Sequence, residues 1–265
     1  MKKEFETLVY SVEDGVALIR LNRPDRMNAI GGSMKDDLES AFFDLARNDS
    51  SVRCVVITGS GDRAFCAGAD IKERAGGVTK GTRFYIRQQA THDLFRRIEE
   101  FEHPVIAALN GVAAGGGLEI ALVCDIRLAA SNARLGLPEV KLGVLPAAGG
   151  TQRLPRLIGE GKAKELMFTG ELITAQEALT IGLVNRVVEP AELMTSAMNM
   201  ARHIAAQPPL AVRFIKRAVN TGTQVGLDSG MQFERFAAAM IIDSEDRQEG
   251  MRAFVEKRAP RFKGE

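Results

Sequence analysis

The chain has 265 residues, of which 45% are hydrophobic and 26% charged, so it can bury a sizeable core in one or two domains. Its 35 lysines and arginines balance its 34 aspartates and glutamates, which argues against general recruitment to nucleic acid or to an anionic membrane. No apolar run reaches the roughly 18 residues that a membrane span requires.

The N-terminal residues and the numbers of cysteines and histidines indicate the cellular compartment and whether a metal site is present. The chain starts MKKEFE, with early acids and no apolar segment, unlike a secretory or transit peptide. Three cysteines are too few for a disulfide framework and suit a reducing compartment. Three histidines lie far apart without ligand spacing, so we expect no metal site. These features predict a cytoplasmic protein.

Strand and helix signals alternate along the first part of the chain. Short β-branched runs at 5–12 and 15–21, separated by Glu13-Asp14, predict a hairpin. Ser33 is placed to cap a helix that extends to about residue 47. The continuous apolar run within 52–59 predicts a strand covered on both faces.

The same alternation continues to about residue 130. The pattern predicts a helix over 82–101, a buried strand over 105–109, a helix over 118–123 and a strand over 126–129. Strands that alternate with helices indicate an α/β architecture with crossover connections.

The last third of the chain contains only helical patterns, over 191–205, 208–220 and 226–257. No Pro/Ser-rich linker separates this part from the rest. We therefore predict a core over residues 1–190, and a helical C-terminal region over 191–265 that packs on the core and takes part in assembly.

A first segment with chemical potential, AFCAGADI (64–71), follows the predicted strand at 52–59. Small residues after a strand let a ligand approach the backbone and leave N–H groups free to donate. Taken alone, the segment favours a tight turn before a helix over a binding site.

A second segment, NGVAAGGGLE (110–119), places three glycines at the start of a helix. Exposed helix N-terminal amides suit a developing negative charge. The segment lacks the endings of a Walker loop and is not GxGxxG, so an oxyanion hole suits it better, with N–H groups from Gly116 and Ala67. Glu119 lies about one turn beyond Gly116 among apolar residues. It is either paired with an arginine such as Arg127 or a functional acid.

A third segment surrounds Glu139, in an apolar stretch punctuated by glycine and proline (137–154). A lone carboxylate is costly there unless it has a role. The alternative is a charge that stabilises the helix start after Pro138.

Together these segments resemble the crotonase superfamily, and within it the enoyl-CoA hydratases. The resemblance rests on AFCAGADIKE (64–73), NGVAAGGGLEIALVCDIRLAA (110–130), LGLPEVKLGVLPAAGGTQRLPRLIG (135–159) and TGELITAQEALTIGLVNRVV (169–188), and it extends to LNRPDRMNAI (21–30) and EGMRAFVEKRAPRF (249–262). It implies an α/β fold, a spiral of repeated ββα units, followed by a helical C-terminal region that trimerises. Two trimers usually form a hexamer.

The resemblance also implies a binding site for an acyl-CoA thioester. Its carbonyl would accept hydrogen bonds from the N–H groups of Ala67 and Gly116. The residues that it implies for CoA binding are Arg26, the backbone of Ala67, Gly68, Ala69 and Asp70, the side chain of Ile71, and, from a neighbouring subunit, Phe254 and Lys257.

The two glutamates separate the activities of this superfamily. Hydratases carry both, and Glu119 and Glu139 occupy both places, whereas isomerases commonly keep one. The resemblance therefore implies reversible addition of water to trans-2-enoyl-CoA, giving 3-hydroxyacyl-CoA: Glu119 activates water for attack at C3, and Glu139 protonates C2. CoA arrives with the substrate and no other cofactor is needed. Ala147 departs from the glycine that hydratases often have beside the catalytic water, at a place where the contact is through backbone.

Three alternatives stay open at this point. Within the superfamily they are an enoyl-CoA isomerase and a ring-processing hydratase or hydrolase of aromatic degradation. The alternative that is not an enzyme is an RNA-binding hydratase homologue. The balance of 35 basic to 34 acidic residues disfavours it. The acyl pocket would be lined by variable segments such as 74–87, so the sequence leaves acyl length open.

Overall fold

The computed structural model describes residues 2–74 and 80–265. Among these residues the larger sheet has seven strands in the spatial order β1-β2-β3-β4-β6-β8-β11. Their bounds are β1 Lys2–Glu4, β2 Leu8–Glu13, β3 Val16–Leu21, β4 Cys54–Gly59, β6 Val105–Leu109, β8 Ile126–Ala130 and β11 Arg186–Val188. From β3 to β11 neighbouring strands are parallel.

A smaller sheet lies beside the first, with the order β10-β9-β7-β5. Its strands have two or three residues each: β5 Ala64–Cys66, β7 Val112–Ala114, β9 Arg134–Gly136 and β10 Ile173–Thr174. Strands β5, β7 and β9 pair in parallel, and β10 runs antiparallel to β9.

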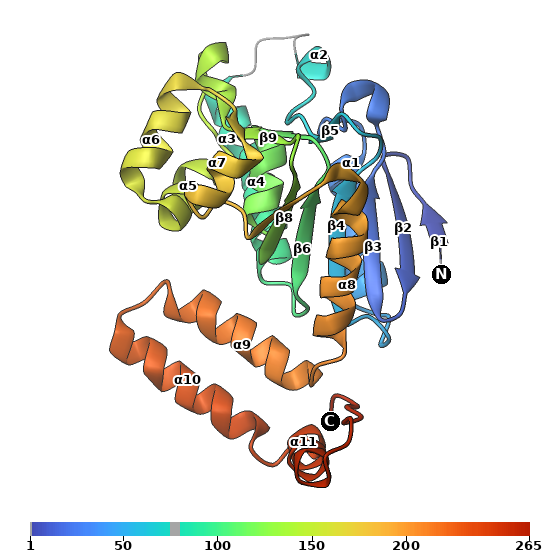
Figure 1. The fold of residues 1–265 in the computed structure, drawn as a ribbon. Coiled ribbons are helices and arrows are strands. Elements are labelled where there is room, and N and C mark those ends of the chain that lie inside the picture. Colours follow the sequence, from blue (N-terminus) through green and yellow to red (C-terminus); the bar gives the residue numbers. More distant parts are fainter. Residues whose placement is uncertain (1, 75–79) are drawn as a thin grey trace.

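The chain visits the two sheets in turn, which produces the spiral. The pairs β4–β5, β6–β7 and β8–β9 each place their first strand in the larger sheet and their second in the smaller one. A helix follows each pair (Figure 1): α3 (Gly81–Glu99), α4 (Gly116–Leu122) and α5 (Gly150–Ile158). These are the repeated ββα units that the resemblance to the crotonase superfamily implies. Between the second and third of these helices lies the 3₁₀ helix η3 (Pro138–Leu142).

The N-terminal hairpin is also as expected. Strands β2 and β3 are antiparallel, and the turn between them uses Asp14 and Gly15 at φ +50° and +75°. Left-handed residues at both turn positions match the twist of the two strands. The helical stretch that follows is α1 (Met34–Glu39), continued as a π-helix over Ser40–Ala46. Ser33 precedes it, but its hydroxyl donates to the carboxylates of Glu6 and Asp37 instead of capping a backbone N–H.

Apolar side chains cover both faces of the larger sheet, because all residues of β4 and β6 are buried. On one face, Phe42, Phe95 and Phe101 belong to the main core. On the other, helix α8 (Leu193–Ala205) packs its alanines Ala197 and Ala201 against the sheet, as Figure 1 shows. Helix α8 therefore packs on the core, and a helical extension follows it after residue 205.

The extension consists of α9 (Pro209–Gly222), α10 (Leu227–Ile241) and α11 (Glu245–Glu256). Helices α9 and α10 lie side by side, away from the sheets (Figure 1). The single helix predicted over 226–257 is wrong, because the chain breaks between α10 and α11. Ser244 marks the break: its hydroxyl accepts the N–H of Arg247 and caps α11. The remaining helices are η1 (Pro24–Arg26), α2 (Ile71–Arg74), α6 (Glu160–Thr169), α7 (Ala175–Thr180) and η4 (Pro190–Glu192).

Candidate active site

The start of α4 supplies an open backbone donor. Gly115 precedes the helix at φ +53°, and a Cβ built on it would lie 2.9 Å from Glu139 Oε1, so both the conformation and the space require glycine. A Cβ on Gly117 would lie 2.0 Å from the Cys66 oxygen, which shows how closely β5 and α4 approach. The N–H of Gly116, in the first turn, has no acceptor within the helix.

The second donor differs from the one that we predicted. The Ala67 N–H donates to the Met27 carbonyl at 3.0 Å, so it is already used and the assignment of Ala67 as an oxyanion donor is wrong. Ile30 N–H donates to Gly68 O at 2.7 Å, and Ile30 O accepts from the N–H of residue 70 at 3.0 Å.

This parallel bridge leaves the intervening Ala69 N–H directed away from Ile30. A Cβ built on Gly116 would lie 3.8 Å from Ala69 N. The structure thus brings the amides of Ala69 and Gly116 to one place, while the Ala67 N–H is already used by the Met27 carbonyl.

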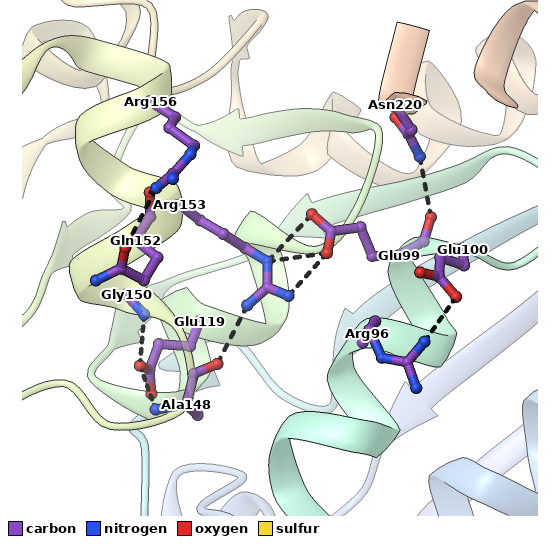
Figure 2. Close-up of polar contacts among 10 residues, drawn as sticks. All are labelled: Arg96, Glu99, Glu100, Glu119, Ala148, Gly150, Gln152, Arg153, Arg156 and Asn220. Carbon is purple, nitrogen blue, oxygen red and sulfur yellow. Dashed lines mark hydrogen bonds and ion pairs between the residues drawn. The ribbon is translucent and has the colours of Figure 1, made fainter. Parts of the chain in front are cut away.

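Glu119 lies in the first turn of α4 and is only 3% exposed. Its Oε1 accepts the N–H of Ala148 at 2.7 Å and that of Gly150 at 2.8 Å (Figure 2). Arg127 donates instead to backbone carbonyls, including Leu183 O at 2.9 Å, so the ion pair considered from the sequence is absent. Burial raises the pKa of Glu119, and the two N–H donors act against that rise.

Glu139 lies in η3 with its carboxylate against Gly115. Its Oε2 is buried and has no hydrogen-bond partner among the described residues. Burial, together with the negative charge of Glu119, raises the pKa of Glu139 to about 7. Close to neutral pH this carboxyl therefore exists in both protonation states, as a proton donor requires.

The loop that holds Glu119 is itself held by side chains that sequence reasoning missed. The Ala147 carbonyl accepts from Gln88 Nε2 at 2.8 Å and from His92 Nε2 at 2.5 Å. Arg153 donates to Ala148 O at 3.3 Å and pairs with Glu99 at 2.7 Å (Figure 2). The spacing of four between residues 88 and 92 places both on one face of α3, but only the fold shows what that face contacts.

The residues expected to bind CoA fall into two groups. Asp70 is buried, pairs with Arg23 at 3.2 Å and accepts the Lys72 N–H at 3.1 Å. Ile71 is half exposed beside it, and Arg26 in η1 is exposed, with Asp25 at 3.7 Å.

The other group lies on the C-terminal helices. Phe254, 85% exposed, is in α11 and Lys257 ends that helix. Figure 1 shows α11 at the opposite end of the molecule from α2 and β5. One chain does not bring Phe254 and Lys257 to the site.

Two searches of the described residues bear on other kinds of site. Within residues 2–74 and 80–265, no three histidine, cysteine or acidic side chains are grouped closely enough to hold a metal ion. In the same part of the chain, no helix combines the length and apolarity that crossing a membrane demands.

The chain is similar to known proteins over nearly its whole length. Residues 11–265 match the model of the family described as enoyl-CoA hydratase/isomerase. The short-chain-enoyl-CoA hydratase of Clostridium acetobutylicum is 46% identical over 96% of this chain and 97% of its own length. The crotonyl-CoA hydratase of Syntrophomonas wolfei is 43% identical over 97% and 98%.

The crystal structure of an enoyl-CoA hydratase from Bacillus anthracis superposes with a TM-score of 0.94 at 43% identity, covering 98% of this chain and all of the other. Because the superposition covers 98% of this chain, it includes both sheets, the glycine-rich start of α4 and the C-terminal helices. The chain therefore belongs to the enoyl-CoA hydratase/isomerase family.

Proposed function

We propose that the chain is an enoyl-CoA hydratase, which adds water reversibly to a trans-2-enoyl-CoA and forms a 3-hydroxyacyl-CoA. The observation that carries the proposal is a pair of carboxyl groups, the buried Glu119 and the half-buried Glu139, beside two open amides. Relatives that are 43–46% identical and named as hydratases support it.

In this proposal the thioester oxygen accepts hydrogen bonds from the N–H groups of Ala69 and Gly116. Negative charge builds on that oxygen as water attacks C3, and preorganised amides stabilise the enolate-like transition state. The amides cost no reorganisation at that moment, because the pairing of Ile30 with Gly68 and Asp70 and the start of α4 already fix them.

The surroundings of the two acids assign their roles. Glu119 has one oxygen held by two N–H groups, which favours the carboxylate and leaves its other oxygen to accept a proton from water. Glu139 has an unpartnered oxygen and a pKa of about 7, which suits donation of a proton to C2. The water oxygen bonds to C3, one water proton passes to Glu119, and the Glu139 proton passes to C2.

Further parts of the proposal concern binding and assembly. The adenine end of CoA would lie against the backbone of residues 67–70 and Ile71, near Arg26. Phe254 and Lys257 would complete the site of a neighbouring subunit in a trimer or hexamer, with no cofactor beyond the CoA of the substrate. The three cysteines are free and buried, which supports a reducing compartment such as the cytoplasm.

A substrate comparison tests the proposal. The purified protein is mixed with trans-2-enoyl-CoA thioesters of graded length, and loss of the enone absorbance is followed. We expect hydration of at least the short thioesters. The matching 3-enoyl-CoA thioesters serve as the second arm, since an isomerase would convert them to the conjugated form and raise the absorbance. Isomerisation without hydration would overturn the proposal.

A further inference from the structure

One peptide group links Glu119 to helix α3. A trans peptide is planar and points its oxygen and its hydrogen in opposite directions. In the peptide between Ala147 and Ala148, the N–H donates to Glu119 at 2.7 Å, while the oxygen accepts from Gln88 and His92. Gln88 and His92 thus bind the oxygen of the same peptide group whose N–H binds the Glu119 carboxylate.

The two donors satisfy the Ala147 oxygen completely. A carbonyl oxygen has two lone pairs, and Gln88 Nε2 and His92 Nε2 lie 2.8 and 2.5 Å from it. Because the partner of His92 is a carbonyl, Nε2 must carry a proton, which is true of both the imidazolium and the Nε2–H tautomer. The hydrogen bond therefore survives a change in the charge of His92.

Several charged groups surround this arrangement. Those that act on Glu119 are Glu139 from η3, Arg153 from α5 and His92 from α3. The charge of Arg153 is largely balanced by Glu99 at 2.7 Å. The charged side chains that line the same cavity as His92 are Asp93, Arg96 and Glu99 from α3, Glu100 directly after it, and Arg153 and Arg156 from α5. Helix α9 contributes only uncharged groups to this cavity.

We propose that Gln88 and His92 are positioning residues for the general base: they orient and polarise the 147–148 peptide, so that its N–H holds the Glu119 carboxylate ready for water. A carbonyl that accepts hydrogen bonds makes the N–H of the same peptide a stronger donor. The inference rests on the proposed hydration and on the role of Glu119 in it. Both residues act through the loop, so they affect turnover more than substrate binding.

The direction of the effect follows from the contacts of Glu119. The Ala148 N–H and a protonated His92 both lower the pKa of Glu119. Without Gln88 and His92 the pKa of Glu119 rises. As the pH falls, Glu119 is then protonated, and stops acting as a base, at a higher pH than in the wild type. The acidic limb of the pH profile of kcat then moves to higher pH.

The test uses Gln88→Leu, His92→Leu and the double variant, assayed with a short trans-2-enoyl-CoA from about pH 5 to 9. Each single change should lower kcat about 3- to 10-fold and the double change about 10- to 100-fold, with KM within about twofold. His92→Gln, which keeps a donor, should recover most of the loss. Matched controls are Gln89→Leu on the same helix and His203→Leu, both exposed, which should leave kcat and the pH profile unchanged.

The outcomes separate this inference from the proposed function. A double variant with wild-type kcat and an unmoved acidic limb overturns it, as does an equal loss in Gln89→Leu or no recovery in His92→Gln. Absence of hydration by the wild type overturns the proposed function instead. In that case the carboxyl ¹³C signal of Glu119, identified by its loss in Glu119→Gln, is titrated. An unchanged pKa in the double variant then overturns the inference, and a raised pKa supports it.

Discussion

At Glu139 the protein places a carboxyl group where ionisation opposes folding. Burial is the main reason that its pKa rises from 4.5 to about 7, and Glu119 adds to the rise. A group whose pKa is raised on folding favours the folded state when it is protonated. Its contribution is complete below about pH 4.5 and is lost as the pH rises through 7.

Glu139→Gln should therefore stabilise the protein at alkaline pH. Relative to wild type, its free energy of unfolding should rise by about 1–2 kcal/mol between pH 4.5 and 8, a value reduced for the partial solvent contact of the carboxyl. Urea unfolding at a fixed protein concentration measures it. Glu160→Gln, on an exposed carboxyl that pairs with Lys164, serves as the control. The same pH dependence in wild type and Glu139→Gln would contradict the account.

Gly116 allows a backbone donor to be removed with little change elsewhere. It is the first residue of α4, where proline is tolerated because the N–H has no helical acceptor. Gly116→Pro should lower kcat about 10²–10³-fold. Gly116→Ala is the matched control, because it adds the same Cβ against Ile30 Cδ1, at 3.0 Å, and keeps the N–H. Equal kcat values for the two variants would show that this amide does not act on the thioester.

The same residues show what a sequence could predict about the site. The glycine-rich helix start could be predicted because three glycines leave backbone N–H groups exposed. The two glutamates could be predicted because a charged side chain is unusual in an apolar stretch. Whether Ala67 or Ala69 has a free N–H depends on backbone hydrogen bonds with Met27 and Ile30. These residues are distant in the sequence, so no local pattern reveals the bonds. Gln88 and His92 are ordinary polar helix residues until α3 packs beside the loop.

At the scale of elements, the five longer strands of the larger sheet were predicted, whereas its three-residue strands β1 and β11 and the strands of the smaller sheet were not. Strands β4 and β6 are runs of five or six buried residues, long enough to give a clear apolar signal. Strands β5, β7 and β9 have three residues each and form by backbone pairing between successive turns of the spiral. The break after α10 was missed because Ser244 lies between two amphipathic stretches that read as one.

Helix α9 is held to the core by a largely buried ion pair, and this contact can be tested alone. Lys216 Nζ lies 2.8 Å from Asp125 Oδ2 and is 8% exposed. Lys216→Met leaves the aspartate without its partner and should cost about 3 kcal/mol. Arg202→Met, on an exposed pair with Asp14, should cost less than about 1 kcal/mol. Urea unfolding compares them, and equal costs would contradict the anchoring role of Lys216.

At the scale of the whole molecule, the C-terminal helices expose apolar surface that the chain does not cover. On α10 and α11 the exposed side chains include Leu227, Met231, Phe236, Met240, Met251 and Phe254. Many exposed large apolar side chains on neighbouring helices in the sequence are typical of protein interfaces. It supports the proposed assembly of three or six chains.

Assembly is tested by light scattering coupled to gel filtration. The wild type should have the mass of three or six chains. Phe236→Glu combined with Met240→Glu places two charges one turn apart on α10 and should shift the mass toward the single chain. Gln232→Glu, on the same helix and exposed, should leave the mass unchanged. A fully active wild-type monomer would contradict both the assembly and the role of a neighbouring subunit in binding.

The paired acids are the central claim, and steady-state hydration of a short trans-2-enoyl-CoA by two variants tests them most directly. Glu119→Gln and Glu139→Gln keep the side-chain shape but remove proton transfer, so each should lower kcat about 10²–10⁴-fold. Acyl-CoA binding should remain in both, measured by calorimetry with a saturated thioester, and Glu160→Gln should match the wild type. Near-wild-type hydration by either active-site variant would contradict the mechanism in which both glutamates act.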